Sequence, residues 1–151
     1  MKTEELLKLL SEEYPSPNWA FIPEFRGGTG YARETRADAL AMHCWPSRGL
    51  ELIGFELKVS RSDWIHEMKN KGKAEPIKQF CDRWYLVTAN SKIVKYAEEM
   101  PHDWGLMFVE NGKLITMIEA PKLTPRPIDR LFLASLMRRA SKQDVIIQSV
   151  N

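Results

Sequence analysis

The sequence predicts one α/β domain with the element order helix, three strands, helix, strand, followed by a hairpin and a last helix. The chain has 151 residues, 44% of them hydrophobic, which is enough for one core and short for two. Short alternating stretches indicate strands, and a helical stretch between two of them predicts a parallel pair in a mixed sheet. We expect a core over about residues 3–120 and a basic helix and tail over 121–151.

Charge and composition limit the partners of the protein. The net charge of +2 is mildly basic, which permits nucleic acid as a partner. Acidic residues gather near Glu4 and Glu12, and arginines gather near Arg138. No apolar run is long enough to span a membrane and the amino terminus has no leader pattern, so we expect a cytoplasmic protein without a membrane partner. Cys44 and Cys81 lack the spacing of a disulfide framework or a zinc site, and we expect both in the core.

The amino-terminal stretch predicts a helix and then a strand. Leu6 and Leu10 belong to an apolar stripe with helical spacing that ends before Pro15. Residues 19–25 predict the first strand, and Pro23 within it favours an edge position or a bulge.

A glycine-rich turn and two further strands follow. Residues 27–30 predict a mobile turn; a phosphate cradle is the less favoured alternative, because the lysine of a nucleotide-binding loop is missing. Residues 36–45 and 50–59 predict two strands joined by a tight turn, and therefore a hairpin.

The register of this hairpin can be counted from its turn. A three-residue turn pairs Trp45 with Gly49, and counting back places Asp38 opposite Glu56. A four-residue turn makes the two acids diagonal neighbours instead. Either register holds two carboxylates within a few ångströms of each other.

The remaining chain is predicted to alternate helices and strands. In order, the predicted elements are a helix capped by Ser60, a second helical piece at 77–81, a strand at 83–88, a short helix from Ser91 to Met100, a hairpin of strands 105–109 and 114–118 around Asn111-Gly112, a proline-rich connector at 121–127 and a helix at 128–140.

The strand around Gly54 carries one carboxylate and one amine on the same face. Side chains alternate along a strand, so Glu56 and Lys58 point one way and Phe55 and Leu57 the other. An acid two residues before a lysine arises by chance more than once in such a chain, and Glu67-Met68-Lys69 is a second copy. That copy lies in a predicted helix, where residues two apart do not face each other.

The facing carboxylates of Asp38 and Glu56 predict a metal site. Like charges at this distance destabilise a sheet unless a group of opposite charge lies between them. Magnesium prefers oxygen ligands and keeps several waters, so two carboxylates and one backbone carbonyl suffice as protein ligands. The alternative is one carboxylate paired with Arg36 or Lys58.

The arrangement resembles the PD-(D/E)XK nuclease superfamily, and within it the MmcB-like DNA-repair proteins. The resemblance rests on Arg36-Ala37-Asp38-Ala39-Leu40, on Ile53-Gly54-Phe55-Glu56-Leu57-Lys58-Val59-Ser60-Arg61-Ser62-Asp63-Trp64, on Cys81-Asp82-Arg83-Trp84-Tyr85-Leu86-Val87 and on Trp104-Gly105-Leu106. It covers roughly residues 17–118. Ala37 replaces the proline of the superfamily's name.

The resemblance implies a restriction-endonuclease-like αβββαβ core and a metal-dependent DNA nuclease that leaves a 5′ phosphate. Asp38, Glu56 and the Leu57 carbonyl would hold Mg²⁺ or Mn²⁺, and Lys58 would orient or activate the attacking water. Glu24 is a candidate accessory ligand, with a surface position as the alternative.

Basic residues outside this strand are candidate DNA contacts. These residues are Lys69, Lys73, Arg138 and Arg139. A solvated helix face is the alternative for each of them. A DNA-binding or assembly module of a repair complex without cleavage, and a nuclease of RNA, remain alternative functions, and the sequence leaves open whether two copies form a homodimer.

Overall fold

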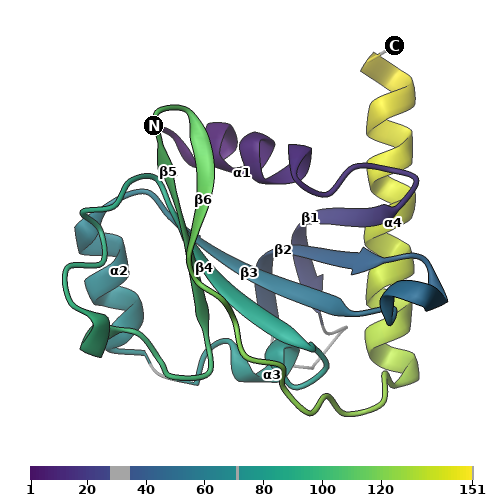
Figure 1. Ribbon diagram of the computed structural model, residues 1–151. Coiled ribbons are helices and arrows are strands. Elements are labelled where there is room, and N and C mark those ends of the chain that lie inside the picture. The colour runs from purple at the N-terminus through teal and green to yellow at the C-terminus, as the bar shows by residue number, and fades with distance from the viewer. Residues whose placement is uncertain (28–34, 71, 151) are drawn as a thin grey trace.

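The computed structural model describes residues 1–27, 35–70 and 72–150, with side chains described as far as residue 142 (Figure 1). The turn expected at 27–30 lies outside the described residues, except for Gly27 at the end of the first strand.

A six-stranded mixed sheet forms the centre of the molecule (Figure 1). Its strands are β1 (Trp19–Gly27), β2 (Thr35–His43), β3 (Leu52–Lys58), β4 (Arg83–Thr88), β5 (Gly105–Glu110) and β6 (Lys113–Ile118), and they lie in this order across the sheet. The β3–β4 and β4–β5 pairs are parallel and the other three pairs are antiparallel. The predicted α/β class, mixed sheet and carboxy-terminal hairpin are therefore confirmed. Asn111 and Gly112 turn this hairpin with φ of 53° and 74°, as the Asn-Gly pair predicts.

Helices cover both faces of the sheet. They are α1 (Thr3–Glu12), α2 (Arg61–Met68), α3 (Glu75–Lys78) and α4 (Arg130–Val150), with short 3₁₀ turns η1 (Pro46–Arg48) and η2 (Ala97–Glu99). Leu6 and Leu10 of α1 are fully buried in the core cluster on one face, while Trp64 of α2 and Ile77 of α3 lie in the cluster on the other. No helix in the described part of the chain is long and apolar enough to cross a membrane.

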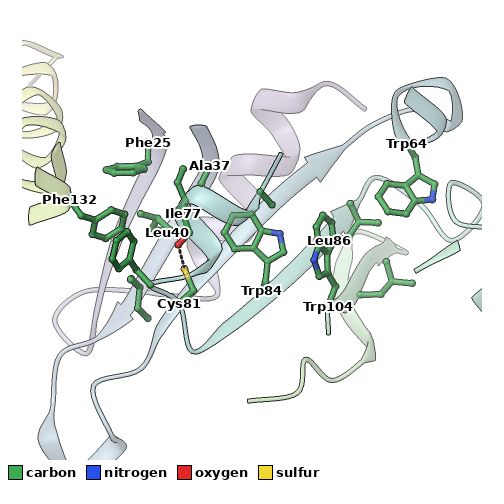
Figure 2. Packing of buried hydrophobic residues seen from close by; sticks show 14 of the residues in the cluster. Phe25, Ala37, Leu40, Trp64, Ile77, Cys81, Trp84, Leu86, Trp104 and Phe132 are labelled. Carbon is green, nitrogen blue, oxygen red and sulfur yellow. Dashed lines mark hydrogen bonds between the residues drawn. The ribbon is translucent and has the colours of Figure 1, made fainter. Parts of the chain in front are cut away.

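Strand β3 separates the two core clusters as its alternation predicts. Phe55 and Leu57 belong to the cluster beneath α1, whereas Leu52 belongs to the cluster beneath α2 and α3. Gly54 lies on that second side, and a Cβ placed on it would come within 2.2 Å of the Trp84 ring. A glycine is therefore required there for Trp84 to lie at the centre of the cluster in Figure 2.

The prediction of a helix from Ser91 to Met100 is wrong. This segment is irregular except for the short turn η2. Arg61 of α2 donates to the Ile93 carbonyl at 2.8 Å and pairs with the Glu99 carboxylate, which also accepts the Lys95 amide at 2.9 Å. These contacts to a distant side chain replace the helical hydrogen bonds.

Two smaller predictions also need correction. Cys44, expected in the core, is exposed, whereas Cys81 is fully buried as expected. Helix α4 starts at Arg130 and extends to Val150, beyond the predicted 128–140.

Helix α4 packs along the edge strand β1 (Figure 1). Phe132 lies between Phe25 of β1 and Phe80, with ring centroids 5.3 and 4.6 Å away. Further along, the Arg139 guanidinium donates to the Pro23 carbonyl at 2.8 Å. The edge position that Pro23 predicts is confirmed, and α4 covers that edge.

We predict that Phe132→Ala lowers the free energy of unfolding by about 3–5 kcal/mol, because it empties a buried aromatic site. Urea unfolding measures the loss. The neighbouring residue Leu133 is 46% exposed, so Leu133→Ala should change stability by less than about 0.5 kcal/mol. Equal losses in both variants would show that Phe132 does not anchor the helix.

Candidate active site

The β2–β3 hairpin brings the two predicted carboxylates together. Ala39 pairs with Phe55 and Met42 with Leu52, which is the register counted from the three-residue turn. One further step along this register places Asp38 opposite Glu56. The alternative diagonal register is therefore not the one adopted.

Asp38 marks the point where β2 leaves β3. The backbone pairing ends at Ala39, and one Asp38 carboxylate oxygen accepts the amide hydrogen of Leu57 at 2.8 Å. A side chain thus takes the place of a ladder carbonyl and satisfies a donor that would otherwise be unpaired. Ala37 and Ala39 lie in opposite core clusters although they are two residues apart, so the alternation of β2 is interrupted at Asp38.

The Lys58 ammonium lies close to two glutamates. It is 3.4 Å from a Glu56 carboxylate oxygen and 3.7 Å from a Glu67 carboxylate oxygen. The same Glu67 oxygen is 3.5 Å from the Lys73 ammonium. Glu56 and Glu67 are buried at 7% and 6% exposure, so their ion pairs are shielded from solvent.

Glu67 is the site residue that sequence reasoning missed. It belongs to the second acid-x-lysine pattern, which lies on a helix, where residues two apart do not face each other. The useful signal is the spacing from Trp64, because residues three apart lie on the same side of a helix. Trp64 is buried, and so Glu67 of α2 is directed toward the sheet as well.

Burial and repulsion between carboxylates raise the pKa values of Glu56 and Asp38. Burial raises the pKa of Glu56 to about 8, the Asp38 and Glu67 carboxylates add to the rise, and Lys58 opposes it. Burial also raises the pKa of Asp38, although the Leu57 amide and Lys58 act against that rise. The cluster therefore favours a bound proton or another cation near Glu56.

The other candidate residues lie around this cluster. Glu24 has an exposed side chain and a φ of 51°, and the β1–β2 register places it opposite Asp38. Its carbonyl accepts from Arg139, so its backbone lies near the site while its side chain is at the surface. Lys69 and Arg138 are exposed, and whether they contact nucleic acid stays a prediction.

The donor chemistry of the cluster suits a hard divalent cation. Carboxylate and carbonyl oxygens are the ligands that Mg²⁺ prefers, and it needs few of them from the protein. Across residues 1–27, 35–70 and 72–142, no three His, Cys, Asp or Glu side chains form a ready-made metal cage. A cation at Asp38 and Glu56 would therefore keep several waters.

Comparisons with known proteins bear on the fold alone. No family model and no curated protein matches the chain. Among solved structures, it is similar to the SPO1766 protein of unknown function from Silicibacter pomeroyi. The two share 18% sequence identity and a TM-score of 0.61, over 97% of this chain and 86% of that chain. The same arrangement of elements thus occurs in a second protein at low identity.

We predict that the metal-free protein loses stability as the pH rises. The pKa of Glu56 is about 8 in the folded protein and 4.5 ordinarily, so between these values the folded state binds more protons than the unfolded chain. The contribution of this group is complete below the lower value and disappears as the pH approaches the higher one. Urea unfolding in EDTA should show a drop of a few kcal/mol between about pH 5 and pH 8.

Glu56→Gln should remove most of this drop, because the amide does not titrate. Glu12→Gln, at an exposed position on α1, should retain it. A slope that survives in Glu56→Gln would assign the pH dependence to other groups.

Proposed function

We propose that this protein is a metal-dependent DNA nuclease with a restriction-endonuclease-like core of the PD-(D/E)XK type. The observation that carries the proposal is the placement of Asp38, Glu56 and Lys58. Asp38 and Glu56 lie directly beyond the last paired residues of β2 and β3, Asp38 accepts the Leu57 amide at 2.8 Å, and the lysine lies 3.4 Å from the Glu56 carboxylate. An acid followed two residues later by a lysine acquires this geometry only on a strand, and β3 is a strand.

Each residue has a physical role in this proposal. Asp38, Glu56 and the Leu57 carbonyl provide the oxygen ligands for Mg²⁺ or Mn²⁺. The ion supplies Lewis acidity, which polarises a phosphoryl oxygen and lowers the pKa of a bound water. Lys58 orients that water and stabilises the negative charge that develops on the phosphate.

Glu67 gives the Lys58 ammonium a second carboxylate partner beside Glu56. Because two buried carboxylates contact Lys58, its position is restrained before substrate binds. Preorganised donors stabilise a transition state more effectively than donors that must move into place.

One observation favours a second candidate, a DNA-binding module without cleavage. Glu67 is within 3.7 Å of both Lys58 and Lys73, so both amines already have an acidic partner. Paired amines of this kind also occur in sites that only stabilise a fold. Cleavage assays separate the two candidates.

The proposed metal site predicts that Asp38→Asn weakens Mg²⁺ and Mn²⁺ binding at least tenfold. The substitution removes a charge but keeps an oxygen that can accept the Leu57 amide, so the fold should persist. Isothermal titration calorimetry measures the binding. Asp63→Asn, at an exposed position on α2, should bind as wild type does. Undiminished binding by Asp38→Asn would place the site elsewhere.

The proposed role of Lys58 predicts that Lys58→Ala lowers the cleavage rate by a factor of about 100 to 1,000, as expected for loss of one preorganised donor. Labelled single-stranded and duplex DNA, with Mg²⁺ or Mn²⁺, are the substrates. Lys58→Ala should still bind DNA, and Lys113→Ala on β6 should cleave at the wild-type rate. Binding without cleavage of any DNA by the wild type would favour the second candidate, and cleavage of RNA alone would change the substrate class.

A further inference from the structure

A cavity of about 430 Å³ lies beside the carboxylate cluster, between α2 and the segment that leads into β5. Its walls include Trp64, Glu67, Met68, Lys73, Met100 and Trp104. Its volume falls within the range of small-molecule sites, which is roughly 300–1,000 Å³. Nothing in the proposed chemistry requires this cavity.

The cavity and the candidate active site share Glu67. This carboxylate lines the cavity and also lies 3.7 Å from the Lys58 ammonium. Lys73, whose side chain is 44% exposed, lies 3.5 Å from the same Glu67 oxygen and lines the cavity too. A group bound in the cavity would therefore be a near neighbour of a phosphate held at Lys58.

The described walls combine apolar and acidic side chains. Trp64 and Trp104 lie with ring centroids 6.3 Å apart, and Met68 and Met100 add apolar surface. The lining carboxylates outnumber the lining amines, with Glu67, Glu75, Glu98, Glu99 and Asp103 against Lys73 and Lys78. Such a lining disfavours a phosphate but can accept hydrogen bonds from amino groups.

The Trp64 ring lines the cavity, and its indole N–H is buried. Trp64 is 1% exposed, and its indole N–H makes no hydrogen bond within the described part of the chain. Because this N–H is also closed to solvent, it offers no donor to a ligand, and the ring contributes apolar surface. The wall thus provides several acceptors around an apolar interior, which suits a planar, neutral ring that carries an amino group.

We propose that this cavity binds one nucleobase of the nucleic-acid substrate, next to the phosphodiester held at Lys58. The inference rests on the proposed function and narrows its substrate. A base inside a duplex is stacked and paired and cannot enter a cavity without being extruded. The protein therefore acts on single strands, flaps or frayed ends in preference to continuous duplex, and it favours bases with an amino group over thymine.

Nuclear magnetic resonance of the indole N–H groups tests the cavity without any cleavage. The Trp64 signal is assigned with Trp64→Phe, and metal-free wild-type protein is titrated with deoxycytidine into the millimolar range, where a single nucleoside is expected to bind. The Trp64 signal should shift with saturation, and thymidine should shift it less. Trp84 is an internal control, because its buried N–H also lacks a described partner but Trp84 does not line the cavity.

A sugar phosphate without a base separates base binding from phosphate binding. Deoxyribose 5-phosphate should leave the Trp64 signal unchanged. A Trp64 signal that does not move with deoxycytidine, or that moves equally with the sugar phosphate or together with Trp84, overturns the inference.

A substitution that fills the cavity tests its use by the substrate. Met100→Trp should weaken binding of a single-stranded oligonucleotide at least fivefold in Ca²⁺ or EDTA. Met117→Trp places the same side chain at a 65% exposed position on β6 and should have no effect. Equal affinities for wild type and a folded Met100→Trp would argue against the cavity as a base site.

These readouts separate the cavity from the nuclease proposal. A protein that cleaves DNA but shows no Trp64 shift keeps the proposed function and loses the base site. A protein that shows the shift but cleaves no nucleic acid keeps the base site and loses the proposed chemistry.

Discussion

The hydrogen bond from the Leu57 amide to the Asp38 carboxylate is the contact on which the site depends. It lets β2 separate from β3 without leaving a buried backbone donor unpaired. It also fixes one carboxylate beside the strand that carries Glu56 and Lys58. The position of Asp38 beside Glu56 therefore follows from the way in which the backbone pairing of β2 and β3 ends, with a side chain accepting the next amide hydrogen.

The charges around Lys58 form a second constraint. Glu56 and Glu67 are buried, and a buried carboxylate is stable only when it is paired or protonated. Lys58 pairs with both, and Lys73 supports Glu67. Removing any one of these groups would leave another uncompensated, so α2 and β3 are coupled through charge as well as through Trp64 packing.

Strands and turns that short sequence patterns determine could be predicted from the sequence. Features that depend on contacts between residues far apart in the chain could not. The alternation around Gly54 and the turn near residues 46–48 left two alternatives for the β2–β3 register, and the structure adopts the one counted from a three-residue turn. The segment after Ser91 has helix-forming residues, but Arg61 bonds to its carbonyl and carboxylate groups instead. Glu67 was missed for a similar reason, because its partner Lys58 lies on another element. The interruption of β2 at Asp38 likewise depends on the Leu57 amide, which is visible only once the strands are placed.

Asp38, Glu56 and Glu67 lie near one another, and the cations that act on them include Lys58, Lys73 and Arg36. Burial is the main cause of the raised pKa values of Glu56 and Asp38, and repulsion from neighbouring carboxylates adds to it. A proton stabilises such a carboxylate, and so would a divalent cation, and the two would then compete for it. A cation that binds at neutral pH would displace the proton from Glu56 and return it to solvent. The same burial and repulsion that weaken the acids would therefore favour the proposed cation, and its affinity would increase as the pH rises.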